Sequence, residues 1–209
     1  MSEHLLEVDD LYVEFRTRDG VAKAINGVSY TLDAGETLAV LGESGSGKSV
    51  TAQTIMGILD MPPGFITGGE IRYKGRDLLQ MPEKERQKIR GAEIAMIFQD
   101  SLSALNPVFT VGDQISEMFQ VHRGMSKKEG MKRAVDLMEQ VRIPGAKDRV
   151  KDYPHQFSGG MRQRIMIAMA ISLDPAVLIA DEPTTALDVT VQAQIMELLQ
   201  ELQRERNMG

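Results

Sequence analysis

A chain of 209 residues, 42% hydrophobic and 26% charged, has the size and composition of one globular domain, which excludes a disordered or fibrous protein. Its 24 basic and 30 acidic side chains give a net charge of −6, so charge-driven binding to nucleic acid or anionic lipid is excluded. The lack of cysteine excludes disulfides and thiolate metal sites. From an acidic N-terminus and the lack of an 18-residue apolar run we expect neither a signal peptide nor a membrane-spanning helix. We expect a cytosolic chain that meets a membrane only through a protein partner.

The first third of the chain is expected to be rich in strands. Short apolar segments alternate with turns, and Arg18-Asp19-Gly20 marks one of these turns. Thr37–Leu41 is too short for a helix and lacks alternation, which predicts a strand buried on both faces. A helix is expected from Lys48 to about Leu59. The expected strands are 6–8, 11–15, 22–32, 37–41 and 68–75.

The rest of the chain alternates apolar strands with helices. One helical stripe is formed by Val111, Ile115, Met118 and Phe119. Ser126 and Glu129 form a capping box that opens a second helix, closed by Pro144-Gly145, with an inward face made of Met131, Val135 and Met138. Further helices are expected at 161–173 and 189–207, and further strands at 94–98 and 176–180. Buried strands separated by helices predict a parallel sheet in an α/β fold.

A glycine-rich loop joins the expected strand at 37–41 to the helix beginning near Lys48. Gly42-Glu43-Ser44-Gly45-Ser46-Gly47-Lys48-Ser49 fits the pattern G-x-x-x-x-G-K-[ST]. Glycines allow successive N–H groups to turn toward one anion, and the helix start adds the positive end of its dipole. Lys48 would reach the β- and γ-phosphates, and the Ser49 hydroxyl would ligate Mg²⁺. The strand–loop–helix order favours a nucleoside triphosphate site over a glycine-rich turn with a solvated lysine.

Two carboxylates follow the expected strand at 176–180, in Asp181-Glu182-Pro183. In open α/β sheets, ligands bind at the carboxyl ends of the strands. Adjacent strand residues point in opposite directions, so the two side chains should have different roles. We expect Asp181 to hold Mg²⁺ through water, and Glu182 to accept a proton from, or orient, the water that attacks the γ-phosphorus.

A second glycine pair, Ser158-Gly159-Gly160, precedes the helix expected at 161–173. Ser158 is a typical N-cap residue for this helix. The segment could also bind an anion, through the Ser158 hydroxyl, the two glycine N–H groups and the start of the helix. The sequence Phe-Ser-Gly-Gly-Met-Arg-Gln-Arg at 157–164, with GESGSGKS before it and LIADEP after it, resembles the nucleotide-binding subunit of ABC transporters. The resemblance covers residues 6–207, with the motifs in the family's order. Phe157 and Met161 replace the commoner leucine and glutamine, which spares the phosphate-facing atoms.

The resemblance implies a P-loop NTPase fold of the ABC ATPase type. It has a parallel-sheet core, an N-terminal antiparallel β-subdomain and an α-helical subdomain at 100–157, inserted in one domain spanning 1–209. The implied catalytic residues are Lys48, Gln99 and Glu182, and the implied Mg²⁺ ligands, partly through water, are Ser49, Gln99 and Asp181. Ala186-Leu187-Asp188 matches the D-loop, with Asp188 as its site residue. The residues implied to bind ATP are Phe15, Gly42, Glu43, Ser44, Gly45, Ser46, Gly47, Lys48, Ser49 and Val50.

Phe15 occupies the position of the aromatic side chain that stacks on adenine in the family, and Tyr12 is a competitor for that role. In the family, two domains pair head to tail, so ATP on one phosphate loop is covered by Ser158, Gly159 and Gly160 of the other domain. In the family, hydrolysis separates the two domains. Their separation moves two permease subunits, which dock on the segment between Gln99 and Ser158. The implied partners are a second nucleotide-binding subunit, identical or homologous, the two permeases and an extracytoplasmic binding protein, without nucleic acid. The implied location is the cytoplasmic face of the membrane.

Three segments, 99–107, 153–157 and 164–170, resemble the dipeptide/oligopeptide (and nickel) importer ATPases. The function this implies is ATP hydrolysis that powers peptide import, with nickel or another small solute as the alternative. His155 is expected to be a structural neighbour of the 158–160 loop. The family has a further strand and a switch histidine after the last helix. Since the sequence stops before both, we expect a C-terminally truncated fragment with low hydrolytic activity on its own.

An ABC ATPase of DNA repair or chromosome maintenance is a rival from another class of protein. Such proteins carry a long coiled coil or zinc modules between the positions of Gln99 and Ser158. Here that segment holds about 58 residues, without cysteine or sustained heptads, and the chain is acidic. These features favour a transporter subunit.

Overall fold

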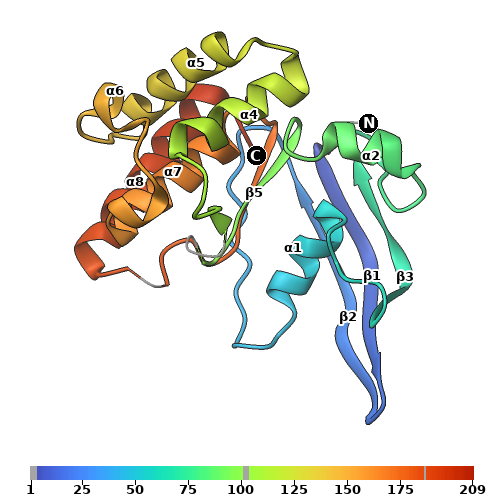
Figure 1. The fold of residues 1–209 in the computed structure, drawn as a ribbon. Coiled ribbons are helices and arrows are strands. Elements are labelled where there is room, and N and C mark those ends of the chain that lie inside the picture. The colour runs from blue at the N-terminus through green and yellow to red at the C-terminus, as the bar shows by residue number, and fades with distance from the viewer. Residues whose placement is uncertain (1–3, 101–103, 186) are drawn as a thin grey trace. The chain divides into compact units, whose positions relative to one another are not determined.

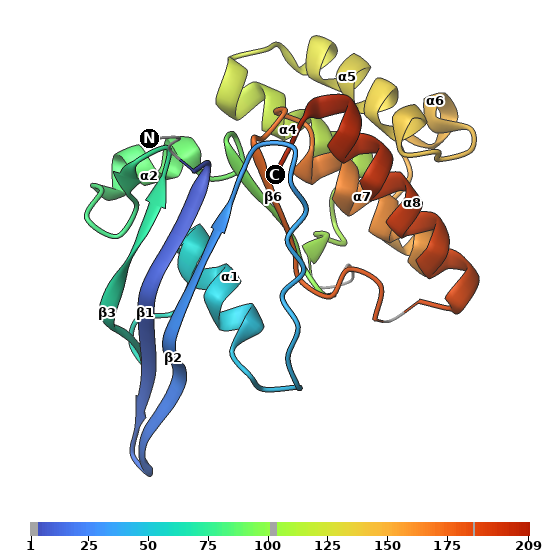
Figure 2. The same cartoon turned by 180° about the vertical axis from the view of Figure 1, so that it is seen from behind.

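The structure is a computed structural model that describes residues 4–100, 104–185 and 187–209. The chain divides into two compact units: one runs up to Arg90 and includes Asn207–Gly209, and the other is Gly91–Arg206. Figures 1 and 2 show the ribbon from opposite sides. Four residues of the motifs discussed above, Ser101, Leu102, Ser103 and Ala186, lie outside the described residues.

The first unit contains an antiparallel sheet with the strand order β2-β1-β3-β4. Its strands are β1 (Leu6–Thr17), β2 (Gly20–Leu32), β3 (Gly64–Tyr73) and β4 (Arg76–Asp77). β1 lies between β2 and β3 and pairs with both, and β1 and β2 form the long hairpin seen in Figure 1. The antiparallel β-subdomain expected at the N-terminus is therefore present.

β1 is one strand rather than the two that the sequence suggested. Its buried residues change parity along the strand, from Leu6 and Val8 to Leu11 and Val13. The register with both neighbouring strands shifts between these two pairs, where Asp10 has a φ of 45°. A bulge that inserts a residue restores the inward direction of the apolar side chains, so the pairing continues past the break in alternation.

Two helices accompany this sheet: α1 (Lys48–Met56) and α2 (Glu83–Ile89). α1 ends three residues earlier than expected because Gly57 takes a left-handed φ of 67°, a common way to end a helix. Arg86 Nη2 donates to the Thr54 carbonyl at 2.8 Å, and Arg90 Nε donates to the Met56 carbonyl at 2.8 Å. Arg90 thus supplies a donor to a carbonyl in the last turn of α1, and Arg86 adds a second donor to the Thr54 carbonyl, which also accepts from the Gly57 N–H at 3.1 Å.

The strand predicted at Thr37–Leu41 is absent, and that prediction is wrong. The segment has no regular secondary structure, and Leu38, Val40 and Leu41 are 40%, 52% and 92% exposed. The physical reason is that an apolar run becomes a strand only when a neighbour shares its ladder of hydrogen bonds. Among the described residues, no strand pairs with this segment.

The second unit is built on two parallel strands, β5 (Ile94–Ile97) and β6 (Val177–Ala180). Ile94 pairs with Val177 and Ile97 with Ala180, which confirms the predicted parallel pairing. β5 is buried along its whole length, as expected of a strand covered on both faces. The helices of this unit are α4 (Val111–Arg123), α5 (Lys127–Gln140), α6 (Ala146–Arg149), the 3₁₀ helix η1 (Pro154–Gln156), α7 (Gly159–Ala170) and α8 (Val189–Arg206).

The predicted capping box at the start of α5 is confirmed. The Ser126 hydroxyl accepts from the Glu129 N–H, and the Glu129 carboxylate accepts from the Ser126 N–H at 2.9 Å. The Ser126 hydroxyl also donates to the Glu129 carboxylate at 2.6 Å, and this bond, together with the one from the Ser126 N–H, lowers the pKa of Glu129 below its ordinary value. The inward face of α5 differs from the expected one, because Met131 and Val135 are only half-buried while Ala134, Leu137 and Met138 are buried.

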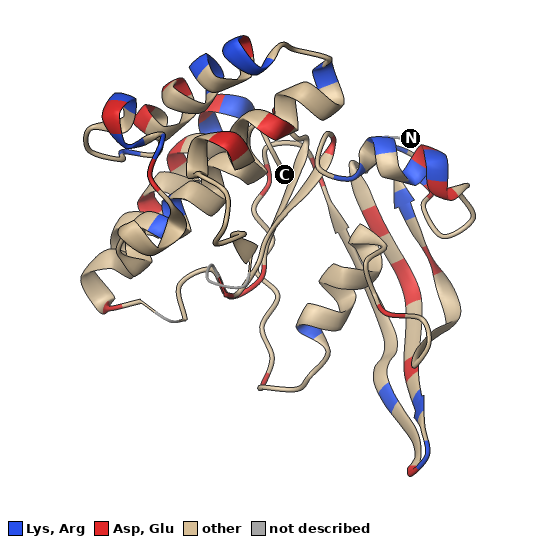
Figure 3. Ribbon diagram, in the orientation of Figure 1, with Lys and Arg blue, Asp and Glu red and all other residues tan. Residues whose placement is uncertain are grey.

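Charged side chains of both signs are interspersed over the helices of the second unit (Figure 3). Arg142, just after α5, pairs with Glu201 at 2.6 Å and with Glu197 at 3.4 Å, which ties α8 to the end of α5. Among the described residues, no helix combines the length and the apolar character needed to cross a membrane.

Candidate functional site

The phosphate loop Gly42–Ser49 leads directly into α1 of the first unit. Gly45 and Gly47 have φ values of 80° and 93°, a left-handed backbone that side chains with a Cβ rarely adopt. A Cβ on Gly47 would also collide with the Ala24 carbonyl of β2. Glycine at position 47 is therefore required twice, by the turn and by the close approach of β2.

Lys48 is the first residue of α1, and its side chain folds back across the loop. Its Nζ donates to the Gly42 carbonyl at 2.8 Å and to the Glu43 carbonyl at 2.9 Å. The ammonium group is thus held over the backbone of the loop rather than extended into solvent. The role of this charge toward the β- and γ-phosphates stays a prediction.

The N-terminus of α1 has the features of an anion site. Its N-cap is Gly47, which offers no capping side chain, and the first turn contains no acidic residue. The Thr51 N–H makes the first helical hydrogen bond, to the Gly47 carbonyl at 2.9 Å. The N–H groups before it, at Lys48, Ser49 and Val50, point along the helix toward its start, where the dipole favours negative charge.

A second group of predicted residues lies in the other unit, at the carboxyl ends of β5 and β6. Gln99 follows β5, and Asp181 and Glu182 follow β6. Because the strands are parallel and in register, these ends meet at one edge: Gln99 Nε2 donates to Glu182 Oε2 at 3.0 Å, and the Asp181 N–H donates to the Ile97 carbonyl at 3.0 Å. The structure therefore brings together two predicted residues that are 83 positions apart.

Glu182 also has an unusual backbone. Its φ of 45° lies in the left-handed region, which non-glycine residues seldom occupy. Such strained positions cluster at functional sites, where the surrounding structure holds them. The half-buried carboxylate of Glu182 is fixed by donors on two sides, Gln99 and Thr185.

Thr185 is a site residue that the sequence analysis missed. Its hydroxyl donates to Glu182 Oε2 at 3.1 Å, and its N–H lies 3.3 Å from the Glu182 carbonyl oxygen. The available signal was a hydroxyl residue three positions after a functional carboxylate, the spacing of a single turn.

We expect Thr185→Val to slow ATP hydrolysis about two- to tenfold, the usual effect of losing one partly exposed hydrogen bond. Valine keeps the shape of threonine but cannot donate to Glu182, so the carboxylate loses the hydrogen bond from the Thr185 hydroxyl. ATP binding should be unchanged, because Thr185 is not part of the phosphate loop. Steady-state turnover and nucleotide titration check this, with the exposed Thr190→Val on α8 as the control. Wild-type turnover in Thr185→Val would remove Thr185 from the site.

Ser158, Gly159 and Gly160 form the start of α7. The Ser158 hydroxyl caps the helix by accepting from the Met161 N–H at 3.3 Å, and no acidic residue occupies the first turn. A Cβ on Gly160 would lie 2.7 Å from Cγ1 of Val191 on α8, so close packing of the two helices also requires a glycine there. Ser158 and Gly160 thus have a structural role beside the anion-binding role that the sequence suggested.

The described part of the D-loop leads into α8. Asp188 is exposed, and its Oδ1 accepts from the Val191 N–H at 3.0 Å, which caps the first turn of α8. Gln192 Nε2 donates to the carbonyls of Thr184 at 3.0 Å and Leu187 at 2.9 Å. These bonds link Thr184 and Leu187 to the first turn of α8.

The two aromatic candidates on β1 differ in what surrounds them. The Tyr12 ring lies against Gly68 of β3 and Gly27 of β2, and the neighbouring Asp10 carboxylate raises the pKa of the Tyr12 phenol. Packing against the neighbouring strands thus accounts for the position of the Tyr12 side chain. Phe15 is half-buried near the end of the same strand, and its role toward adenine stays a prediction.

The predicted metal ligands offer oxygen atoms only: the Ser49 hydroxyl, the Gln99 amide oxygen and the Asp181 carboxylate. Hydroxyl, amide and carboxylate oxygens are the ligands that Mg²⁺ prefers, together with water and substrate phosphates. Within residues 4–100, 104–185 and 187–209, no three His, Cys, Asp or Glu side chains cluster so that they could hold a metal by themselves. Ser49 belongs to the first unit and Gln99 and Asp181 to the second, and the role of these three residues toward Mg²⁺ stays a prediction.

Residues 25–185 match the family described as ABC transporter. The chain is 57% identical over 201 residues to the oligopeptide transport ATP-binding protein OppD of Bacillus subtilis, covering 96% of this chain and 56% of that protein. It is 56% identical to the dipeptide transport ATP-binding protein DppD of Lactococcus lactis, covering 98% of this chain and 59% of that protein. The chain thus spans less than two thirds of the length of these curated relatives.

Two solved structures share the fold. The dimeric cassette MJ0796, in a post-hydrolysis state bound to ADP and Pi, aligns with a TM-score of 0.84 and 28% identity over 97% of this chain and 84% of that chain. The cbiO1 protein of Clostridium perfringens, part of an ABC transporter complex, aligns with a TM-score of 0.78 and 29% identity over 99% of this chain and 76% of that chain. The fold expected from the phosphate loop and the two later motifs is therefore confirmed.

Proposed function

The chain belongs to the ABC transporter family, and from that premise we propose that it is the ATP-binding and ATP-hydrolysing subunit of an importer of dipeptides or oligopeptides. The observation that carries the nucleotide part of this proposal is the phosphate loop. Lys48 spans the carbonyls of Gly42 and Glu43, above a helix start without an acidic or capping side chain. The peptide part is supported by relatives that are named as oligopeptide and dipeptide transport proteins.

In the proposed reaction, the phosphates of ATP lie on the N–H groups of the phosphate loop. The Lys48 ammonium group exchanges its two carbonyl partners for the β- and γ-phosphates, where a full positive charge offsets the negative charge of the leaving ADP. Gly42–Val50 supply the cradle, and Phe15 stacks on the adenine.

Glu182 is the proposed base. It accepts a proton from the water that attacks the γ-phosphorus, so that ADP and phosphate are released. Gln99 and Thr185 hold its carboxylate in one rotamer, which lowers the cost of orienting it at the moment of attack. Bound together with ATP, Mg²⁺ would reduce the negative charge on the phosphates, and Ser49, Gln99 and Asp181 are the residues proposed to hold it, partly through water.

We propose that two such subunits, identical or homologous, pair head to tail. Ser158, Gly159 and Gly160 of one subunit then cover the ATP that the other subunit holds, and Asp188 lies at the same interface. Neither subunit alone neutralises the charge of the triphosphate, so bound ATP holds the two subunits together. Hydrolysis of ATP then allows the two subunits to separate. Residues 1–209 form one nucleotide-binding domain in this proposal, with the helical subdomain at 100–157 as the surface that meets the permeases.

The proposed setting is the cytoplasmic face of the cell membrane. There, two permease subunits link the ATPase pair to the membrane, and an extracytoplasmic binding protein delivers the peptide. The substrate is set by those other subunits, and the sequence similarity to peptide importers is the support for it.

Uptake by a strain that lacks the gene for this chain tests the proposal. We expect loss of labelled dipeptide or oligopeptide uptake, restored by the wild-type gene but not by Lys48→Ala, and copurification of the tagged protein with two permease subunits. Loss of ⁶³Ni²⁺ uptake with normal peptide uptake would assign the chain to nickel import instead. Sensitivity to DNA damage with both uptakes intact would overturn the transporter assignment.

A further inference from the structure

Arg149, the last residue of α6, contacts the chain that leads into α7 at four points. Its Nε lies 3.1 Å from Asp152 Oδ2, and its Nη2 donates to the Gln156 carbonyl at 3.0 Å. The guanidinium carbon lies 4.1 Å from the centre of the Phe157 ring, and Nη1 lies 3.4 Å from the sulfur of Met161. One side chain thus joins residues on both sides of Ser158–Gly160.

These contacts use the edges and the face of a planar group. The edges of the guanidinium donate to a carboxylate, a carbonyl and a sulfur, while its face covers the aromatic ring of Phe157. The ring is 3% exposed, so this side of Arg149 is removed from water, although the Arg149 side chain as a whole is 26% exposed. A lysine would keep the positive charge, but it would lose the several N–H donors of the guanidinium and the stacking of its planar face on the Phe157 ring.

The backbone before Ser158 is fixed from a second direction. Arg162, on the first turn of α7, donates from Nη1 to the Phe157 carbonyl at 2.9 Å. Two arginines therefore hold two successive carbonyls, those of Gln156 and Phe157, immediately before the helix begins. The direction in which Ser158 enters α7 depends on these bonds, because neither residue 157 nor residue 158 belongs to a helix or a strand.

We propose that Arg149 is a positioning residue for the loop Ser158–Gly160, which it holds in the orientation needed to cover the ATP of the second subunit. This inference rests on the proposed function, in which that loop acts across the dimer. Its consequence is specific: a change at Arg149 spares the nucleotide bound by its own subunit and weakens the site completed on the partner.

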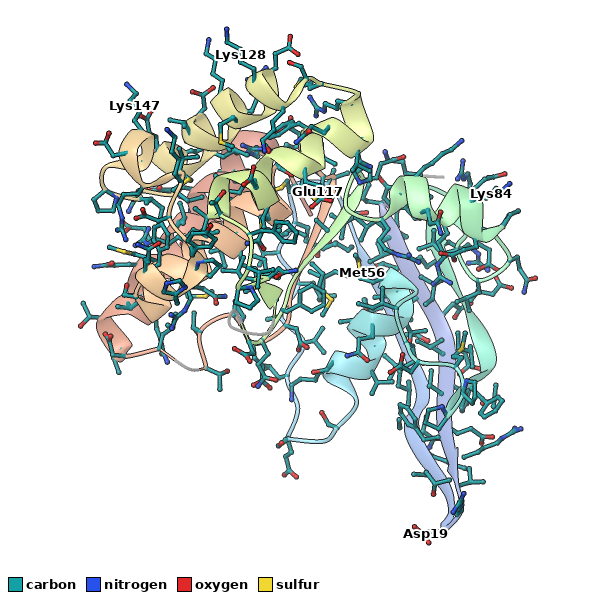
Figure 4. All side chains as sticks on the ribbon, in the orientation of Figure 1. Asp19, Met56, Lys84, Glu117, Lys128 and Lys147 are labelled. Atoms are coloured by element: carbon teal, nitrogen blue, oxygen red, sulfur yellow. The ribbon has the colours of Figure 1, made fainter. Side chains whose placement is uncertain are left out.

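The first test measures ATP-dependent pairing in the full-length protein with Glu182→Gln, in which hydrolysis does not dissolve the pair. We expect Arg149→Lys to raise the ATP concentration needed for half-maximal dimer formation about tenfold, as for the loss of a charge-assisted hydrogen bond. Binding of a fluorescent ATP analogue to the monomer should stay unchanged. The control is Lys147→Ala on the same short helix, whose side chain is 80% exposed and projects outward in Figure 4.

The second test separates positioning from general damage by mixing variants. With Arg149→Lys and Lys48→Ala on opposite protomers, one of the two composite sites is intact and hydrolysis should persist. With both changes on the same protomer, each site has one defect, and hydrolysis at a limiting ATP concentration should fall well below that of the opposite-protomer arrangement. General misfolding of the Arg149→Lys subunit would weaken both arrangements alike.

Phe157→Leu provides an independent variant in case Arg149→Lys lowers stability. It removes the ring that the guanidinium covers but keeps an apolar side chain in the buried position, and we expect a smaller rise in the same ATP concentration. The inference is overturned by wild-type dimerisation of Arg149→Lys, or by equal losses in monomer binding and dimer formation. Should the parent Glu182→Gln protein itself fail to pair with ATP, the proposed function fails together with this inference.

Discussion

Glu182→Gln is expected to reduce ATP turnover about 100- to 10,000-fold while ATP binding persists. The reason lies in the geometry of the carboxylate. Glu182 Oε2 accepts from Gln99 Nε2 at 3.0 Å and from the Thr185 hydroxyl at 3.1 Å. The carbonyl oxygen of a glutamine can accept the same two bonds, so the substitution preserves the shape of the site and removes only the base.

The expected intermediate of this variant is an ATP-bound dimer that accumulates because hydrolysis cannot release it. Phosphate release and size-exclusion chromatography with ATP measure the two effects separately. Glu197→Gln is a matched control in the same unit: it makes the same chemical change on the exposed side of α8, where Glu197 pairs with Arg142 at 3.4 Å. Phosphate release at the wild-type rate by Glu182→Gln would remove Glu182 from the role of base.

Lys48→Ala should weaken ATP binding about 100-fold, since the triphosphate loses its one full positive charge from the phosphate loop. The variant also removes the two hydrogen bonds from Nζ to the Gly42 and Glu43 carbonyls, so the loop itself loses support. These two effects are separable with shorter nucleotides. AMP, which lacks the β- and γ-phosphates, should lose little affinity if the charge dominates.

Titrations of ATP, ADP and AMP against Lys48→Ala therefore form one experiment. Lys84→Ala is the control, because Lys84 belongs to the same unit and lies on the exposed side of α2 (Figure 4). Equal losses for all three nucleotides would mean that Lys48 supports the loop rather than the phosphates. Unchanged ATP binding would contradict the assignment of this loop as the nucleotide site.

Local signals predicted most helices of the second unit because their ends and faces are encoded within a few residues. The Ser126–Glu129 capping box marks the start of α5, and the Ser158 cap marks the start of α7. The short helices α2 and α6 were missed because they lack such local signals. α2 has seven residues, of which only Ile89 is buried, and α6 has four, so neither has a periodic apolar face.

Strands were predicted less well because their formation depends on partners that are distant in sequence. Thr37–Leu41 has the composition of a buried strand, yet it forms none among the described residues, where no strand pairs with it. Conversely, β1 continues through the polar break at Asp9-Asp10, because β2 and β3 hold both of its edges through the bulge.

The sequence also gave no reason to connect Phe157 and Met161, the two positions at which the signature motif departs from the commoner residues. In the structure both side chains touch the same guanidinium, that of Arg149. The motif alone predicts which groups face phosphate. It contains no information about Arg149, several residues earlier, whose guanidinium contacts both of these side chains.

The sequence by itself determined the family, the α/β class and the positions of the loops that we propose bind nucleotide, because these depend on short runs of residue types. Only the tertiary structure decided that Gln99 and Thr185 share the Glu182 carboxylate, and that Arg149 braces the start of α7. The physical reason is that a hydrogen bond depends on distance and direction in space. Parallel pairing of β5 with β6 brings residues 83 positions apart within 3.0 Å, and spacing along a single chain does not encode such a contact.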